Sequence, residues 1–320
     1  MPNIAIGLFL FAVSIFSLHG SAAAETSKNI ESAIRHAWET NDCKRAASLM
    51  DEMRTTSSQA VYSFYQAEAF EFGRCSERNI DKAITAYKNA YNISQSLGAM
   101  HIGALYLNEK NDPETAQKWF RVLAFFYVLP PEEQKENIEG QANLIKVLKD
   151  IYSNTTFNKR DFPERNISQE IQWATKLLSA DPKKIFKYSL IFEKGTNGYP
   201  KNRNAAARLL HQAVMFSYPP AAWHQAQHII KKNHNGNKRS LYLLLKPLEI
   251  ASLGGIPEAQ VELAQTYWKL DKKKKAYSWF LYARKNGISV EDQIKKLEKI
   301  IDPSTAQYYR DNIEQKGRKP

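Results

Sequence analysis

Glycine and proline are scarce in this sequence, and their scarcity excludes two classes of protein. Its 320 residues include only 13 Gly and 13 Pro. A collagen-like protein is excluded, and an all-β sandwich is disfavoured because it needs many tight turns. Since 43% of the residues are hydrophobic and 24% are charged, the composition is that of a globular protein, with neither a disordered nor a fibrous bias.

Motifs of the common enzyme classes are also missing. The sequence contains no G-x-S-x-G, no H-E-x-x-H, and no Walker-type or Rossmann glycine pattern. We therefore predict no catalytic residue, no cofactor and no enzymatic activity. An enzyme that uses a less familiar arrangement stays the remote alternative.

Two histidines have a spacing that suits metal binding. His224 and His228 lie four residues apart, with His234 beyond them, so a helix would place the first two on one face. No cysteine is nearby, and no acidic residue lies between His211 and Glu249. We interpret these histidines as surface or core side chains and predict no metal site.

Only one long apolar run occurs, over residues 4–18 (IAIGLFLFAVSIFSL). Its 15 residues match a signal-peptide core and fall short of the ~20 that a membrane-spanning helix needs. Ala22-Ala23-Ala24 is a small-x-small cleavage site ahead of Glu25. No Lys or Arg precedes the run, so an uncleaved membrane anchor is the alternative. We expect a periplasmic or secreted protein with no membrane span once the signal is removed.

The only two cysteines are Cys43 and Cys75. An even pair in an exported chain favours a disulfide. The closed loop of roughly thirty residues would stabilise the fold by about 3–4 kcal/mol on the loop-entropy account. Two reduced, buried thiols are the alternative, because spacing alone does not bring the two Cα atoms within reach.

After Glu25 the hydrophobic pattern is helical almost throughout. Apolar residues recur at i, i+3, i+4 and i+7, and no run alternates with a period of two. Acidic residues and prolines stand at the expected helix starts, and glycines stand at several expected ends. The expected helices cover residues 28–40, 43–54, 58–72, 79–94, 97–109, 113–128, 132–152, 167–180, 183–194, 202–216, 220–232, 239–253, 257–269, 272–286, 290–300 and 303–315.

A frame of small and aromatic residues repeats along the chain. Residues 259–287 carry it most fully, and residues 64–90, 98–124 and 188–213 carry it again. A small residue of the second helix in each copy stands at Ala83, Ala116, Ala206, Ser240 and Ala276. Two short helices with two tight loops take about 34–36 residues, so this spacing predicts stacked helix pairs. An ordinary helical bundle core is the alternative.

This frame resembles the Sel-one-like repeat, the longer relative of the tetratricopeptide repeat. The resemblance covers residues 64–124 and 184–287. Two copies depart from the pattern: residues 259–287 lack the interhelical glycines, and residues 220–255 have Pro247 inside the second helix. The resemblance implies an all-α fold, a right-handed α-solenoid of stacked antiparallel helix pairs that binds other proteins and needs no active site.

The repeat positions predict the organisation of the whole chain. The spacing of 90 residues between Ala116 and Ala206 leaves room for one enlarged, degenerate pair. The expected segments are a signal peptide (1–24), N-terminal capping helices (25–60), Sel-one-like repeats (61–130), a degenerate enlarged helix pair (131–181), further repeats (182–288), and C-terminal capping helices with a basic tail (289–320).

Positive charge is concentrated in the second half. Residues 25–181 contain 19 Lys and Arg against 22 Asp and Glu, a net charge of −3, whereas residues 182–320 contain 26 against 11, a net charge of +15. The densest basic run is Lys272, Lys273, Lys274 and Lys275. This run is either a solvated face or a docking surface for an acidic protein, an anionic envelope polymer or lipid headgroups. A nucleic-acid partner is not expected of an exported solenoid.

Together these features predict an exported repeat protein that binds a partner protein. An adaptor or regulator in the cell envelope is the first hypothesis. The alternative is an immunity or inhibitor protein that neutralises an exported toxin or hydrolase.

The first testable prediction concerns the signal segment. We expect the mature chain to begin at about Glu25 and to be soluble after export, because the cleavage site follows a core too short to span a bilayer. N-terminal sequencing of the protein from its native host checks this. A membrane-bound form that retains Met1 would contradict it.

Overall fold

A computed structural model describes residues 21–93, 98–125, 146, 149–150, 162–232, 237–315 and 319–320. Across these residues the regular elements are all helical, and no strand occurs. None of the helices within them is both long and apolar enough to cross a membrane. The predicted signal core at residues 4–18 and most of the predicted enlarged pair at 131–181 lie outside the described residues.

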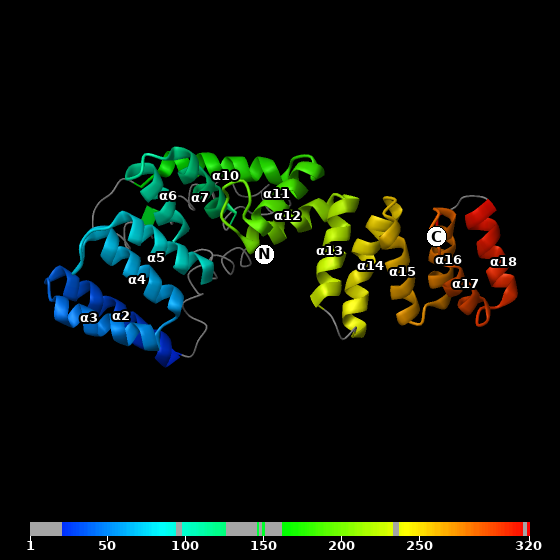
Figure 1. Cartoon of the computed structure of the whole chain (residues 1–320), viewed down its shortest axis with the longest axis horizontal. Helices are drawn as coiled ribbons and strands as arrows, with labels where there is room; N and C mark the ends of the chain where they lie inside the picture. The colour runs from blue at the N-terminus through cyan, green and yellow to red at the C-terminus, as the bar shows by residue number, and fades with distance from the viewer. Residues whose placement is uncertain are drawn as a thin grey trace, which may run out of the picture. The chain divides into compact units, whose positions relative to one another are not determined.

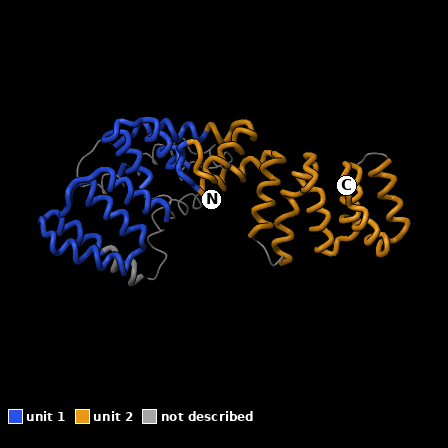
Figure 2. Tube along the Cα trace, viewed as in Figure 1, with its two compact units in different colours: residues 1–175, 198–202 blue, residues 176–197, 203–320 orange. Residues whose placement is uncertain are grey.

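The helices form two compact units, which Figure 2 colours blue and orange. Unit 1 comprises residues 1–175 with 198–202, and unit 2 comprises residues 176–197 with 203–320. The described helices that lie in unit 1, wholly or for the most part, are α2 (Ser21–Glu39), α3 (Cys43–Thr56), α4 (Gln59–Phe72), α5 (Ile80–Ile93), α6 (Ala99–Asn108), α7 (Pro113–Ala124) and α10 (Glu164–Leu178).

Unit 2 continues the same pattern of short helices. Its described elements are α11 (Pro182–Lys194), α12 (Arg203–Met215), α13 (Pro219–Lys232), α14 (Lys238–Leu253), α15 (Pro257–Lys269), α16 (Lys273–Lys285), α17 (Glu291–Glu298), α18 (Pro303–Arg310) and a π-helical turn, η2 (Asp311–Gln315). Figure 1 shows α13, α14, α15 and α16 side by side.

Consecutive helices pack in pairs, and within each unit neighbouring pairs pack on one another. The pairs are α2 with α3, α4 with α5, and α6 with α7 in unit 1, and α11 with α12, α13 with α14, and α15 with α16 in unit 2. Further contacts join α5 to α6 and α14 to α15. The fold is therefore an all-α solenoid of stacked helix pairs, and the fold class predicted from the sequence is confirmed. The six-segment organisation stays a prediction.

The predicted helix boundaries agree closely with the structure. Most described helices begin and end within two or three residues of the expected positions. The first helix is longer than expected, because α2 begins at Ser21. The last predicted helix, over residues 303–315, is α-helical only to Arg310 and then becomes the π-helical turn η2.

Capping side chains explain why the boundaries were readable. Asp112, Asp181 and Asp302 each accept a hydrogen bond from a backbone N–H in the first turn of the following helix. Each is followed by a proline at the start of the helix, where no intrahelical donor is lost. At the other end, Gly73 and Gly195 adopt left-handed conformations, with φ of 65° and 69°, that close α4 and α11.

The small residues of the repeat frame lie where paired helices meet. The five predicted small positions, Ala83, Ala116, Ala206, Ser240 and Ala276, are all buried. Gly103 of α6 is one place of close approach, where an added Cβ atom would clash with the Phe120 ring on α7. Because no real side chain tolerates such a clash, glycine is what allows the Phe120 ring to fill the space between the two helices.

One copy of the frame breaks the pattern at the surface. The residue three positions after the small residue is buried as Trp119, Leu209 and Trp279, but the equivalent Leu243 of α14 is 60% exposed. The next residue, Leu244, is buried, as Phe120 and Phe280 are at the same position. Pro247 lies inside the same helix and has no N–H to offer the carbonyl of Leu243. The departure seen in the sequence at residues 220–255 is thus a local change in which side chains face the core.

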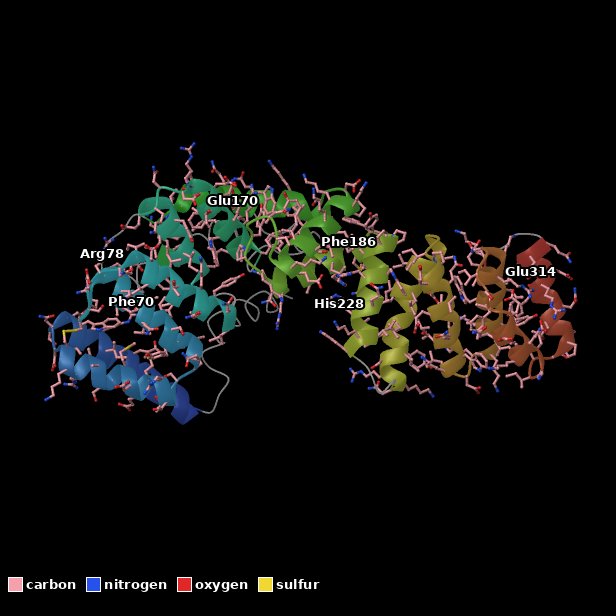
Figure 3. The ribbon with its side chains drawn as sticks, in the orientation of Figure 1. Phe70, Arg78, Glu170, Phe186, His228 and Glu314 are labelled. Carbon is pink, nitrogen blue, oxygen red and sulfur yellow. A yellow bond between two sulfur atoms is a disulfide. The ribbon has the colours of Figure 1, made fainter. Side chains whose placement is uncertain are left out.

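The structure joins Cys43 to Cys75 in a disulfide, drawn in yellow in Figure 3, with the two Cα atoms 5.1 Å apart. Cys43 is the first residue of α3, and Cys75 lies in the loop that follows α4. The bond therefore ties the first helix pair of unit 1 to the second. The disulfide predicted from the sequence is confirmed, and the alternative of two reduced thiols is not observed.

The second prediction concerns this cross-link. Replacing both cysteines (Cys43→Ser with Cys75→Ser) should lower the free energy of unfolding of unit 1 by about 3–4 kcal/mol, because the open chain gains loop entropy when unfolded. Urea unfolding of both proteins measures the difference. Chemical reduction of the unaltered protein should give a matching loss. Two alkylated thiols in the intact mass of the exported protein would contradict the cross-link.

Candidate functional site

The four lysines of the basic run, interpreted from the sequence as either a solvated face or a docking surface, have different surroundings in the structure. Lys272 lies beside α14, with its Nζ 5.1 Å from the centre of the Tyr242 ring. Lys273 pairs with Asp271 at 3.1 Å, and Lys275 lies over the Tyr267 ring at 5.2 Å. Lys274 is exposed. The structure therefore brings Lys272 to a neighbouring helix and gives Lys273 and Lys275 local partners.

The neighbouring helix α14 carries a stripe of exposed side chains beside Lys272. Arg239, Tyr242, Leu243 and Lys246 follow one another at intervals of three, one and three residues, so they share one face of α14. All four are exposed, Tyr242 by 48% and Leu243 by 60%. Together with Lys272 they form what we call the basic–aromatic face.

Cations and apolar atoms alternate over this face. Lys272 contacts the Tyr242 ring through a cation–π interaction, which at an exposed site contributes about 0.5–1 kcal/mol. The nearest carboxylates in the sequence are engaged elsewhere: Glu249 accepts a hydrogen bond from the Tyr267 hydroxyl, and Asp271 pairs with Lys273. Burial, together with that bond to Glu249, raises the pKa of Tyr267, so its hydroxyl stays a donor. The face thus offers positive charge around an uncovered tyrosine and leucine.

Exposed large apolar side chains are concentrated in unit 2. Of the eight found among the described residues, only Ile93 belongs to unit 1. The other seven are Met215, Phe216, Tyr242, Leu243, Leu253, Ile300 and Tyr308. Clusters of exposed apolar atoms rimmed by polar groups mark interaction surfaces. Unit 2 therefore combines exposed apolar surface with the excess of positive charge.

A small pocket in unit 1 has a different character. It lies between α7 and α10, has a volume of about 270 Å³ and is lined by Pro113, Glu114, Gln117, Phe120, Asn166, Gln169 and Glu170. Glu170, labelled in Figure 3, accepts hydrogen bonds from Gln117 at 2.8 Å and from Arg121 at 2.6 Å. The volume is below the usual range for ligand pockets, and both carboxylate oxygens are engaged. We therefore assign no base or ligand site to this pocket.

Unit 1 also contains buried carboxylates that the sequence analysis did not single out. Glu68 and Glu71 of α4 are almost fully buried. The Tyr87 hydroxyl donates to Oε2 of Glu71 at 2.6 Å, and Nδ1 of His101 lies 4.0 Å from the same oxygen. The sequence signal for this group was the spacing of three residues between the two glutamates on a mainly apolar helix. Because the group is closed off from solvent, we interpret it as structural.

Glu68 is the member of this group with the most perturbed ionisation. Its Oε2 lies 3.6 Å from Nη2 of Arg35, beyond hydrogen-bond distance. Burial, only partly offset by Arg35, raises the pKa of Glu68 to about 8. The side chain is therefore largely protonated in the folded protein at neutral pH.

The two histidines of α13 have an acidic neighbour after all. Oε2 of Glu193, on α11, lies 2.8 Å from Nε2 of His224, and Oε1 lies 3.1 Å from Nε2 of His228. Burial opposes ionisation of Glu193, but its bonds to both histidines lower its pKa overall. The sequence search along the chain near the histidines missed Glu193 because it lies 31 residues before His224. The sequence segment between His211 and Glu249 holds no acidic residue, and the fold supplies one from α11.

Comparison with known proteins gives a likeness of fold. No protein-family model matches the chain, and no curated protein matches it. One similar solved structure is a protective antigen present in uropathogenic Escherichia coli strains that displays an SLR fold; it is 16% identical, with a TM-score of 0.31. The match covers 90% of this chain and 62% of the antigen. A Sel1 repeat protein from Oxalobacter formigenes is also 16% identical, with coverage of 90% and 100% and a TM-score of 0.28.

These proteins are what the chain is similar to, and such low scores carry no functional argument. The helix pairs described above show an all-α solenoid on their own evidence, and the likeness to Sel-one-like repeats stays a resemblance of the sequence frame.

The third prediction follows from Glu68. The folded protein keeps a proton on this group that the unfolded chain loses at a pKa near 4.5, so stability falls as the pH rises from about 4.5 to 8. The slope attributable to one such proton is up to about 1.4 kcal/mol per pH unit. Glu68→Gln should flatten this slope and make unit 1 more stable than the unaltered protein at pH 8.

Urea midpoints measured from pH 5 to pH 8.5 check this expectation. The matched control is Glu52→Gln, which changes an exposed glutamate of α3 in the same unit. A Glu68→Gln protein with the pH dependence of the unaltered one would contradict the assignment.

Proposed function

We propose that this protein is a non-enzymatic binding scaffold of the cell envelope that captures an acidic partner protein through the basic–aromatic face. The observation that carries the proposal is the exposure of Tyr242 and Leu243 between Arg239, Lys246 and Lys272. A soluble repeat protein gains nothing in stability from uncovering Leu243, whose equivalents in three other copies are buried. A partner that covers it recovers that burial.

The positive charge of residues 182–320 indicates that the partner is acidic. The net charge of +15 over residues 182–320 steers negatively charged molecules and raises their association rate. The apolar core of the face then determines how long the complex lasts, because burial of aromatic and aliphatic anchors acts mainly on dissociation. An acidic protein surface with an apolar centre fits both requirements, whereas an anionic polymer would use the cations alone.

Export is part of the same proposal. The apolar run at residues 4–18 and the small-x-small site ahead of Glu25 support it. The disulfide between Cys43 and Cys75 supports it too, since such bonds persist in oxidising compartments. An adaptor or regulator is the role we favour. An inhibitor of an exported toxin or hydrolase could use the same face, and the identity of the captured partner separates these two roles.

The fourth prediction tests the face with two variants. Tyr242→Ser with Leu243→Ser should shorten the lifetime of the complex by about tenfold or more, because the apolar anchors are lost. Arg239→Glu with Lys246→Glu shifts the charge by −4 and should slow association by about tenfold at low salt, with a weaker dependence on salt. Capture from envelope extract of the native host identifies the partner, and surface binding kinetics measure both rates.

The matched control is Lys295→Glu with Lys296→Glu, which makes the same charge change on exposed residues of α17. This control should lower the association rate much less than Arg239→Glu with Lys246→Glu does. If all three proteins captured the same partner at the rates of the unaltered protein, the face would not be the binding surface. Loss of binding in the charge variant alone, with the apolar variant unaffected, would point to an anionic polymer.

A further inference from the structure

A compact cluster of metal-ligating side chains lies in unit 2 and shares no residue with the proposed docking face. It consists of Glu193, His224 and His228, and one potential ligand atom of each lies within 4.8 Å of the other two. The two contacts to Glu193, at 2.8 Å and 3.1 Å, use different oxygens of its carboxylate and Nε2 of each histidine. All three donor groups therefore already converge on one point.

Two helices hold these side chains in place. His224 and His228 are one helical turn apart on α13, and Glu193 is the penultimate residue of α11. Phe186, seven residues before Glu193 and therefore on the same face of α11, packs its ring against His224 with the centroids 5.7 Å apart. Figure 3 labels Phe186 and His228 on these two helices. The His224 ring is thus braced by packing as well as by its bond to Glu193.

Access and donor chemistry both suit a transition metal. The three side chains are partly exposed, His224 least and His228 most, so an ion can reach them from solvent. Two imidazole nitrogens and one carboxylate oxygen form a donor set that zinc and related divalent metals bind at about 2.0–2.2 Å. Calcium and magnesium prefer sites built from oxygen ligands.

We propose that Glu193, His224 and His228 bind one divalent transition-metal ion of the zinc class. The ion takes the place of the two histidine–glutamate hydrogen bonds, with each Nε2 and a carboxylate oxygen turned onto the metal. Three protein ligands leave at least one coordination position, which water fills from the exposed side. The site joins α11 to α13, so bound metal cross-links two consecutive helix pairs of unit 2.

The fifth prediction uses zinc as the probe. Untagged full-length protein, freed of metal with a chelator, should bind one Zn²⁺ saturably in a calorimetric titration, and bound Zn²⁺ should raise the thermal midpoint of unfolding. Each of His224→Gln, His228→Gln and Glu193→Gln should weaken binding by about tenfold or more. The matched control, His211→Gln, changes an exposed histidine of α12 and should bind as the unaltered protein does.

A second measurement identifies the ligands independently of affinity. Co²⁺ bound at this site should give the visible absorption of nitrogen and oxygen coordination, and His224→Gln should abolish it while circular dichroism shows the helices intact. Absence of saturable Zn²⁺ binding would overturn the proposal. Unchanged binding by Glu193→Gln would also overturn it, because the two histidines would then bind alone. These outcomes do not depend on the docking face, which shares no residue with this site.

Discussion

The close approach of two helices within each pair is the constraint on which the rest of the structure depends. A small residue where the helices meet permits it, and an aromatic ring then fills the space that remains, as Gly103 and Phe120 do between α6 and α7. Each pair leaves an apolar side that only the next pair covers, so stability accumulates through neighbours. The positions of the disulfide, the buried carboxylates and the histidine cluster all follow from which pairs are adjacent.

Features that depend on local chemistry could be predicted from the sequence. Helix starts were readable because Asp112, Asp181 and Asp302 cap their helices through their own side chains. The pairing of Cys43 with Cys75 was predictable because no other cysteine competes. The spacing of the small residues predicted the helix pairs, since every copy must satisfy the same packing requirement.

Features that join different helices were beyond the sequence pattern. Glu193 of α11 contacts His224 and His228 of α13, and no local sequence pattern indicates that contact. The burial of Glu68 was hidden because a glutamate within a helix is normally placed on the solvent side. The basic run at 272–275 was visible, but its division between ring contacts, an ion pair and a solvent-exposed lysine depends on Tyr242, Tyr267 and Asp271 around it.

Among the described helices, α14 alone has a proline in its interior, Pro247. Because residue 247 has no N–H, the main-chain oxygen of Leu243 cannot accept the usual helical bond from it and is left to water or to another donor. That oxygen belongs to the same residue whose side chain is 60% exposed. The helix therefore lacks one main-chain restraint directly beside the basic–aromatic face. Since proline is where helices kink, α14 can bend at this point with less loss of hydrogen bonding than a helix with an unbroken ladder.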